Sequence, residues 1–303
     1  MPQGFRSTVL PLLAALIWGI SFVGQSTLAA VMPPLAITAL RSIIACLALL
    51  AAVFLFRCFE KKRGRMPQKQ DKRSLLIGGV ATGVALTAAA NLQQAGLVST
   101  SAGKASFITA LYIVLVPICG IFLGKKVTGR LWLAVVLATV GLYLISVGGA
   151  FRVERGDLFV FLCALCFACH ILVVDHFTKK VDPLCLSCMQ FATCTVLSGI
   201  ASFLTEEVQL SGVPLGTWLW PLLYIGFFSS GVGFTLQILA QQGGDAALVS
   251  LLLSLESVFG AFAGAVLLHE RMSAREILGC FIMFIAIVLA QLPVPVKKRV
   301  PDR

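Results

Sequence analysis

Residues Leu111–Ile145 read LYIVLVPICGIFLGKKVTGRLWLAVVLATVGLYLI, and residues Leu255–Ala290 read LESVFGAFAGAVLLHERMSAREILGCFIMFIAIVLA. Each stretch contains two long apolar runs separated by a short segment with charged residues. Each stretch also completes a set of five apolar runs, one set in each half of the chain. Because five membrane crossings are an odd number, the second set would begin on the opposite side of the membrane. The two stretches therefore predict an inverted repeat, the architecture of many secondary transporters.

The composition places the chain in a membrane. Of its 303 residues, 58% are hydrophobic and 12% are charged, and the mean hydropathy is +0.96. A water-soluble protein of this length could not bury so much apolar surface. A helix of roughly 20 apolar residues is long enough to cross a hydrocarbon core of ~30 Å. Ten such segments are expected near residues 8–30, 34–56, 74–97, 101–123, 131–150, 157–178, 183–204, 217–240, 245–268 and 274–292.

The predicted fold class is all-α integral membrane, with ten transmembrane helices as two inverted five-helix repeats. Strands of a barrel would alternate apolar and polar residues, and these segments do not. A constant offset supports the repeat, because Pro34 aligns with Pro183 and Arg41 with Gln190 at the same spacing of 149 residues. The two repeats are expected to occupy residues 1–150 (spans 1–5) and 151–303 (spans 6–10).

The net charge of +11 is distributed unevenly between the two sides of the predicted membrane. If the N-terminus is cytoplasmic, the inner segments hold 18 of the 24 Lys and Arg residues and the outer loops hold four. The remaining two, Arg41 and Lys104, lie within predicted spans. This is the positive-inside bias of membrane proteins rather than a nucleic-acid-binding patch. It predicts a multi-pass protein of the cell (inner or plasma) membrane with both termini in the cytoplasm.

Four stretches resemble a known family. They are ALIWGISFVGQ (15–25), PPLAITALR (33–41), FITALYIVLVPICGIFLG (107–124) and SLESVFGAFAGAVLLHERMSAREILG (254–279). Together they are similar to the EamA type of the drug/metabolite transporter superfamily. The resemblance covers nearly the whole chain. It implies ten helices in two inverted five-helix repeats, with a central cavity built mainly from the first four helices of each half.

The sequence departs from the family pattern at two places. The family usually reads Leu-Glu-Pro-Val-Phe in the ninth span, and here Ser257 replaces the proline. The family's usual Glu at the end of the fourth span is also missing, with Lys125 and Lys126 in that region, whereas Glu270 is retained in the second half. The resemblance is specific for the family and weak for the substrate.

Ionisable residues inside predicted spans are the first candidates for function, because charge is costly in a membrane. Glu256 lies about ten residues into the ninth span, near the bilayer middle; it is either a proton- or substrate-coupling group or a structural carboxylate between helices. Arg41 suits a substrate carboxylate or phosphate, and a structural ion pair is the alternative. Lys104 either extends to the interface or attracts anions at the outer mouth of a transport path.

Polar side chains at helical spacing add further candidates. Such faces should avoid lipid and meet inside the bundle, where amides either join helices or line a path. His170 aligns with the first-span residue Ser21 and lines the cavity or makes an interhelical hydrogen bond. The candidate substrate and coupling residues are Glu256, Arg41, Lys104, Trp18, Ser21, Gln25, Asn91, Gln94, Tyr112, His170, Gln190, Gln237 and Gln241.

One motif points away from the transporter interpretation. Cys166, Cys169 and His170 spell CxxCH, the attachment pattern of c-type haem. The motif lies inside an apolar segment, whereas haem attachment needs an accessible loop, and thiols along one helix do not converge on a metal. We therefore expect no cofactor and no metal. No phosphate-binding loop is visible, which argues against ATP-driven pumping by this chain alone.

The sequence thus favours a secondary-active transporter of small polar metabolites, amino-acid-like or related, working by alternating access and exporting its substrate. Protons are a candidate coupling ion, the lipid bilayer is the expected surrounding, a homodimer stays open, and no nucleic acid is expected. One alternative is a membrane-embedded enzyme acting on a lipid or isoprenoid, for which Asp175 and His176 are the one visible catalytic pair. A non-transporting membrane scaffold is the other alternative.

Overall fold

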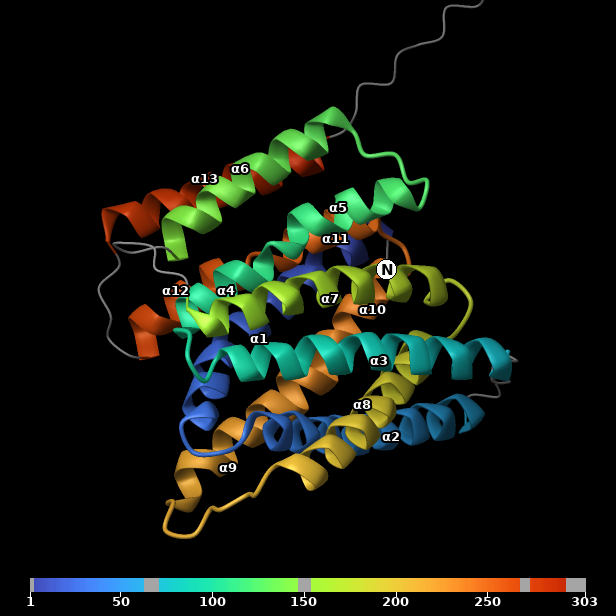
Figure 1. Cartoon of the computed structure of the whole chain (residues 1–303). Helices are drawn as coiled ribbons and strands as arrows, with labels where there is room; N and C mark the ends of the chain where they lie inside the picture. The colour runs from blue at the N-terminus through green and yellow to red at the C-terminus, as the bar shows by residue number, and fades with distance from the viewer. Residues whose placement is uncertain (1–2, 63–70, 147–153, 268–272, 293–303) are drawn as a thin grey trace, which may run out of the picture.

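The computed structural model describes residues 3–62, 71–146, 154–267 and 273–292. Throughout these residues the chain is helical and contains no strand. Figure 1 shows most of the helices lying side by side across the molecule, as in a membrane-spanning bundle. The all-α prediction is confirmed; the arrangement as an inverted repeat of ten helices stays a prediction.

The described helices follow one another in the two halves of the chain. The first half contains α1 (Gln3–Ala29), α2 (Pro34–Lys62), α3 (Lys72–Gly96), α4 (Ala102–Ala110), α5 (Tyr112–Phe122) and α6 (Gly129–Ser146). The second half contains α7 (Arg155–Phe177), α8 (Pro183–Thr205), α9 (Leu215–Leu223), the π-helix η1 (Tyr224–Gly233), α10 (Phe234–Gln241), α11 (Ala246–Leu253), α12 (Glu256–Leu267) and α13 (Ala274–Gln291).

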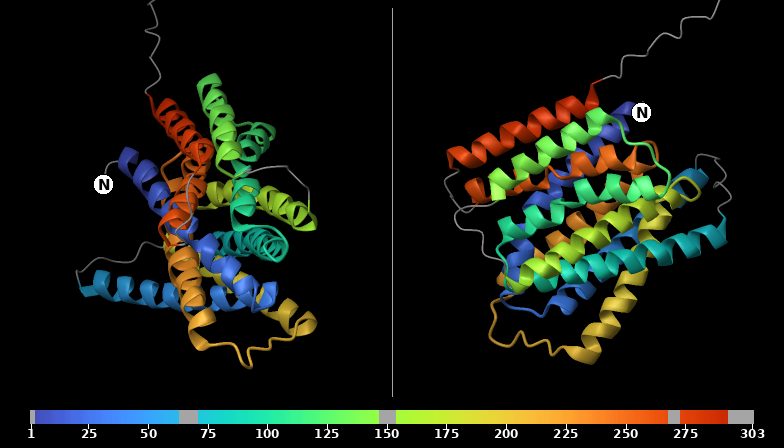
Figure 2. Two further views of the ribbon diagram at one scale, coloured as in Figure 1. Left: turned by 90° about the vertical axis from the view of Figure 1, so that its left-hand side faces the viewer. Right: turned by 45° about the horizontal axis from the view of Figure 1, so that its top comes forward.

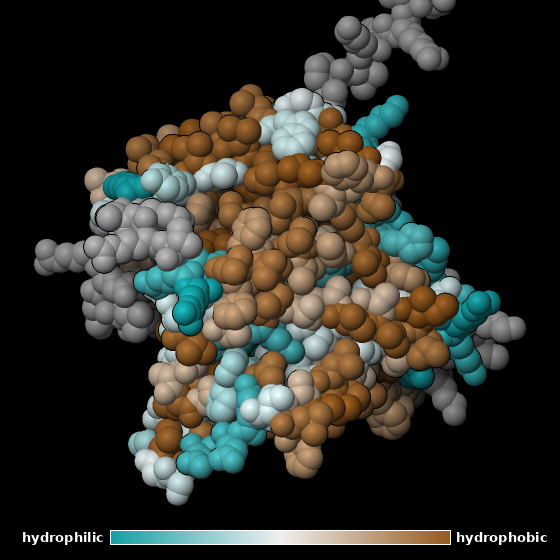
Figure 3. All heavy atoms as spheres, viewed as in Figure 1, coloured by the Kyte–Doolittle hydropathy of each residue, from teal (hydrophilic) through white to brown (hydrophobic). Residues whose placement is uncertain are grey.

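Nine helical segments of the described chain are long and apolar enough to cross a membrane. Gly129–Ile145 forms a shorter apolar helix, and together these segments occupy the ten predicted positions. Large apolar side chains are exposed on the outside of the bundle, for example Phe122 and Phe203. In Figure 3 apolar side chains cover much of one face, and the larger polar groups lie toward its left and right ends. This surface is suited to a lipid surrounding.

Polar residues mark where several helices begin. The side chain of Asp182 accepts a hydrogen bond from the backbone N–H of Cys185 at the start of α8. Asp245 accepts from the N–H groups of Ala247 and Leu248 at the start of α11. These acidic caps satisfy backbone donors that would otherwise have no helical partner. The helix boundaries therefore follow from short polar residues placed before apolar runs.

Two of the spans are interrupted near their middles. The span formed by α4 and α5 breaks at Leu111, whose N–H bonds to the carbonyl of Ile108, three residues back. The span formed by α11 and α12 breaks at Ser254 and Leu255, with the N–H of Leu255 bonded to the carbonyl of Leu252. These tighter turns interrupt the regular α-helix within each span. The sequence predicts both spans, near residues 101–123 and 245–268, as continuous helices.

Glycines let several helices cross at short range. A Cβ atom at Gly83 would lie 2.8 Å from the backbone oxygen of Gln190, and one at Gly79 would overlap the side chain of Met189. These contacts join α3 to α8. At Gly19 a Cβ atom would lie 2.7 Å from the backbone nitrogen of Gly260, where α1 crosses α12. Gly79 and Gly83 are four residues apart on α3, a GxxxG spacing typical of close helix packing.

Long-range packing connects the two halves of the chain. The helix α6 packs along α13, and both views in Figure 2 show the two side by side. The helix α3 packs on α7 and α8, and α1 packs on α12, η1 and α10. The first and second halves are therefore interleaved rather than separate, and the cavity described next lies where their helices meet.

Candidate functional site

One cavity stands out among the described residues. The space open to the centres of water molecules is about 40 Å³, room for only a few water molecules in this conformation. Its walls come from α1, α2, α3, the broken α4–α5 span, α7, α8, the η1–α10 span and the broken α11–α12 span. The lining residues are Trp18, Ser21, Phe22, Gln25, Arg41, Ser42, Leu86, Ala90, Gln93, Thr109, Tyr112, Phe167, Ile171, Phe191, Cys194, Ser229, Phe234, Gln237, Leu253 and Glu256.

Arg41 brings a positive charge into this cavity from α2. Its Nε donates to Ser230 Oγ at 2.8 Å, its Nη1 to Gln25 Oε1 at 2.9 Å, and its Nη2 lies 3.4 Å from Ser229 Oγ. The residue is 5% exposed. All three partners are neutral, and within the described residues Arg41 forms no ion pair. The guanidinium is therefore positioned by neutral hydrogen-bond partners from α1 and η1.

The π-helix η1 explains how two adjacent serines reach the same guanidinium. In η1 the wider turn of a π-helix replaces the α-helical turn over ten residues. Both Ser229 and Ser230 are buried and lie beside Arg41. The carbonyl of Ser229 accepts a hydrogen bond from Trp18 Nε1 at 3.0 Å. Segments of π-helix occur frequently at functional sites, and this one builds a wall of the cavity.

Glu256 brings the carboxyl group of the cavity. It is the first residue of α12, directly after the break in its span. Tyr112, the first residue of α5, lies directly after the break in the other interrupted span and donates its hydroxyl to Glu256 Oε1 at 3.1 Å. Both side chains are buried. The two helix breaks thus meet at one hydrogen bond.

Aromatic rings form the apolar part of the cavity wall. Phe234 is the centre of this group, with its ring 4.8 Å from the ring of Trp18, 5.6 Å from Phe191 and 6.3 Å from Phe167. These rings come from α1, α7, α8 and α10. A ligand in the cavity would therefore meet polar groups at Arg41 and at Glu256 and an apolar surface between its other walls.

The structure brings seven of the thirteen predicted residues to the cavity wall. These are Trp18, Ser21, Gln25, Arg41, Tyr112, Gln237 and Glu256. Ser21 accepts from Gln25 Nε2 at 3.3 Å and so extends the hydrogen-bond network of Arg41. Within the described residues the partners of Arg41 are hydroxyl and amide groups, and no ion pair is formed.

The other six predicted residues lie behind the cavity wall or away from it. Asn91 bonds to Ser198, His170 Nε2 lies 3.0 Å from Gln190 Oε1, and Lys104 forms an ion pair with Asp157. Gln94 and Gln241 donate to backbone carbonyls of neighbouring helices. His170 therefore makes an interhelical hydrogen bond, the second of its two expected roles.

Sequence reasoning missed several residues of the site. Ser229 and Ser230, which hold Arg41, carry no signal in the sequence beyond being two hydroxyls in an apolar span. Thr109 and Gln93 line the cavity and bond to each other at 3.2 Å. Asp157, the partner of Lys104, was also missed. Asp157 is two residues into α7, and its carboxylate lies 2.5 Å from Lys104 Nζ. This contact follows only from the packing of α4 on α7.

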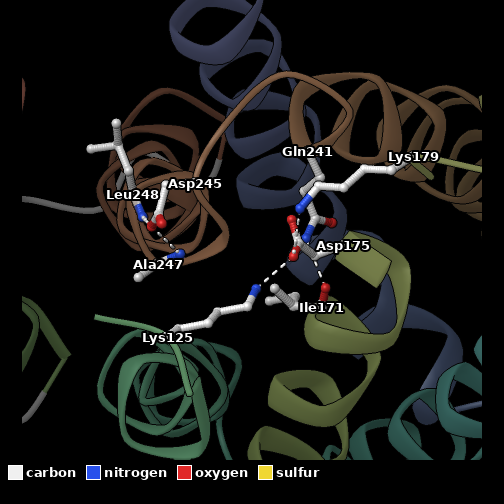
Figure 4. A network of polar contacts seen from close by, with 8 residues as sticks. All are labelled: Lys125, Ile171, Asp175, Lys179, Gln241, Asp245, Ala247 and Leu248. Atoms are coloured by element: carbon white, nitrogen blue, oxygen red, sulfur yellow. Dashed lines mark hydrogen bonds and ion pairs between the residues drawn. The ribbon is translucent and has the colours of Figure 1, made fainter. Parts of the chain in front are cut away.

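A second polar network lies at one end of the bundle (Figure 4). Asp175 Oδ2 lies 2.5 Å from Lys125 Nζ and 3.2 Å from Lys179 Nζ. His176 Nε2 lies 2.9 Å from Lys180 Nζ. Asp175 and His176, the pair on which the enzyme alternative depended, therefore each bind a lysine. No group of metal-ligating residues occurs within the described ranges.

Comparisons with known proteins agree with this architecture. The model of the EamA-like transporter family matches residues 6–147 and again residues 154–292. An uncharacterized transporter of Archaeoglobus fulgidus is 29% identical over 284 residues, which are 93% of this chain and 84% of that protein. The uncharacterized transporter YoaV of Bacillus subtilis is 24% identical over 277 residues, 88% of this chain and 90% of that protein.

A solved crystal structure shows the same fold. It superposes with a TM-score of 0.75 at 20% identity, over 94% of this chain and 96% of the solved one. The apolar helices and the relatives named as transporters together describe a multi-pass membrane protein. Because the family model covers both halves of the sequence, the chain belongs to the EamA-like transporter family.

Proposed function

We propose that this protein is a secondary-active exporter of small amino-acid-like metabolites that works by alternating access. The observation that carries the proposal is the cavity with Arg41 and Glu256 in its walls. Within the described residues, each of the two has only neutral hydrogen-bond partners. A cationic and an acidic side chain enclosed among apolar helices are costly unless a ligand or another conformation uses them.

The two polar ends of the cavity match the two ends of a zwitterion. The planar guanidinium of Arg41 can bind a carboxylate through two parallel hydrogen bonds. An ammonium group suits the carboxylate form of Glu256, with the Tyr112 hydroxyl beside it. The rings around Phe234 would contact the apolar part of the substrate. A compound that carries both charged groups on a small apolar body is complementary to all three regions.

Several features support an inverted repeat as the basis of alternating access. The family model matches the chain twice in succession. The offset of 145 residues pairs Leu111, where one span breaks, with Glu256, directly after the break at Ser254 and Leu255 in the other span. Span 1 contacts spans 8 and 9, and span 6 contacts spans 3 and 4, as the exchange of two halves requires. In transporters of this kind, interrupted helices at the repeat interface surround the substrate, and the repeats move around it.

Glu256 is the proposed coupling group. Its closest partner is Tyr112 on α5, and the other charged group in the cavity wall is Arg41 on α2. A proton taken up by Glu256 at one face and released at the other would alternate with the substrate's ammonium group. This exchange would connect substrate export to the proton gradient and make the transport rate depend on pH.

The experiment has two stages. Untargeted metabolite profiling of cells and medium, with and without expression, identifies the compound that accumulates outside. That compound is then measured in vesicles over a range of pH with the native protein and with Glu256→Gln. We expect the variant to lose most of the transport rate and its dependence on pH.

The matched control is Glu207→Gln, since Glu207 is an exposed carboxylate in the segment between α8 and α9. This control should transport at the native rate. A Glu256→Gln variant that keeps both the native rate and the native pH dependence would contradict the coupling role of Glu256.

A further inference from the structure

Two buried glutamines make corresponding contacts on opposite sides of the cavity. Gln94, near the end of α3, donates from Nε2 to the backbone oxygen of Gln25 in α1 at 3.1 Å. Gln241, the last residue of α10, donates from Nε2 to the backbone oxygen of Ile171 in α7 at 2.8 Å. Both glutamine residues are fully buried. In each case a side-chain amide joins one helix to the main chain of a helix that lines the cavity.

The two glutamines lie at equivalent positions of the proposed repeat. They are 147 residues apart, between the offsets of 149 in the first spans and 145 in the last. Gln94 joins span 3 to span 1, and Gln241 joins span 8 to span 6. The exchange of the two halves converts one donor into the other. It brings the acceptors together to within one helical turn, since the offset of 149 pairs Gln25 with Val174, three residues after Ile171. This step rests on the inverted repeat put forward under the proposed function.

The equivalent contacts lie toward opposite ends of the bundle. In Figure 1 α3 ends on the left of the molecule, and the chain leaves α10 on the right. Figure 4 shows Gln241 beside Asp175 and the lysines that bind it. Gln94 instead precedes the segment of Thr100, which donates to Asp157 at the other end of α7. Under the proposed orientation, Gln94 is on the outer side of the cavity and Gln241 on the cytoplasmic side.

Each contact is also connected to the cavity. Gln25, whose backbone accepts from Gln94, uses its side-chain Oε1 to accept from Arg41. Gln241 uses its Oε1 to accept from Gln237 Nε2 at 3.0 Å, and Gln237 lines the cavity. A ligand that displaced Gln25 from Arg41 would therefore disturb the residue that accepts from Gln94. A ligand that displaced Gln241 from Gln237 would disturb the other glutamine itself.

The Gln94 contact leaves part of the amide unused. Gln94 Oε1 is buried and has no hydrogen-bond partner among the described residues. Buried polar atoms are seldom left in this state, and an amide that is half satisfied here gains partners when water reaches it. The closed conformation is therefore poised to give up this contact when the outer side opens.

From these observations we propose that Gln94 and Gln241 are paired latches, of which Gln94 holds the outer side of the cavity closed and Gln241 the cytoplasmic side. Both are closed in this structure. Alternating access then requires that one latch opens while the other stays closed. The latch proposal differs from simple helix packing in its prediction that loss of each glutamine exposes the cavity to a different face.

Cys194 provides a native reporter of cavity exposure. It lines the cavity from α8 and is buried, with Ser42 Oγ at 3.2 Å from its Sγ. A charged, membrane-impermeant methanethiosulfonate is added to intact cells, and separately to inside-out vesicles. Modification of Cys194 is then quantified by peptide mass spectrometry in the otherwise native protein.

Gln94→Leu should raise the modification rate of Cys194 from the outer face, and Gln241→Leu should raise it from the cytoplasmic face. The expected increase is about fivefold, the factor that one net hydrogen bond contributes to a conformational equilibrium. Gln242→Leu is the matched control, since Gln242 is an exposed glutamine directly after Gln241. It should leave both rates unchanged.

Equal exposure to both faces, exposure to the same face in both variants, or no change in either would overturn the proposal. Size-exclusion chromatography of each variant shows whether it is folded, and Gln94→Met and Gln241→Met replace any leucine variant that is not. The labelling needs no substrate. If the two variants exposed Cys194 to opposite faces but the protein exported no metabolite, the latch proposal would stand and the proposed function would be contradicted.

Discussion

At the residue scale, the arrangement around Arg41 shows why lysine could not replace it. Three nitrogens of the guanidinium reach three oxygens in different directions, from Ser230, Gln25 and Ser229. A lysine carries one ammonium group on a flexible stem and cannot occupy those directions in a fixed plane. The three bonds of Arg41 use three of the five N–H donors of the guanidinium. The charge and its orientation are therefore separate contributions that substitutions can distinguish.

Arg41→Lys should keep the protein folded and charged but weaken substrate binding. We expect the KM of the identified substrate to rise by about tenfold or more, because charge-assisted hydrogen bonds are each worth about 1.5–3 kcal/mol. Ser230→Ala, which removes one neutral partner of Arg41, should produce a smaller increase. Initial rates in vesicles over a range of substrate concentrations provide the measurement. An unchanged KM in Arg41→Lys would show that Arg41 does not bind the substrate.

The same residues show how far the sequence can predict the site. Arg41, Lys104 and Glu256 stand out because charges are rare in apolar spans. The sequence could not distinguish Arg41, which has neutral partners, from Lys104, which is paired with Asp157. Partners such as Ser230 are 189 residues away along the chain. Which charge meets which partner is decided by tertiary packing between distant segments, and the local sequence around each charge carries little information about it.

At the element scale, the helices could be predicted and their irregularities could not. Apolar length determines where a chain crosses a membrane, so the ten segments agree with the observed helices within a few residues. The break at Leu111 and the π-helix over Tyr224–Gly233 lie in equally apolar sequence. Such local changes in hydrogen bonding depend on neighbouring helices, which satisfy the freed backbone groups. The irregular elements are among those that line the cavity.

The crossing of α3 and α8 gives a prediction about stability. Gly83→Leu places a side chain where even a Cβ atom would lie 2.8 Å from the backbone oxygen of Gln190. The two helices must separate, at a cost of about 1–3 kcal/mol or more. The thermal midpoint in detergent, followed by size-exclusion chromatography after heating, should fall by several degrees.

The control for that substitution lies on the partner helix. Gly199 is on α8, and a Cβ atom there would have no neighbour within 4 Å. Gly199→Leu should therefore leave the thermal midpoint close to that of the native protein. If both leucine variants were equally destabilised, the effect would come from added bulk in the membrane rather than from the contact between α3 and α8.

At the scale of the whole molecule, function depends on which end of the bundle faces which side of the membrane. The charge distribution predicts this orientation, since 18 Lys and Arg lie on one side of the predicted spans and four in the loops on the other. The Lys125–Asp175 contact lies at the more basic end and the Lys104–Asp157 contact at the other. The orientation therefore decides which ion pair and which glutamine face the cytoplasm.

Reporter fusions test this orientation directly. Green fluorescent protein fused after residue 303 or inserted after residue 66 should fluoresce, because both positions are predicted to be cytoplasmic. Alkaline phosphatase, which is active only outside the cytoplasm, should be active when inserted after residue 210, in the segment between α8 and α9. The expected pattern requires an odd number of crossings between residues 66 and 210, which the five predicted helices provide. Alkaline phosphatase should be inactive when inserted after residue 66. If it were active both there and after residue 210, the number of crossings between the two positions would be even, and the two halves would then not be inverted.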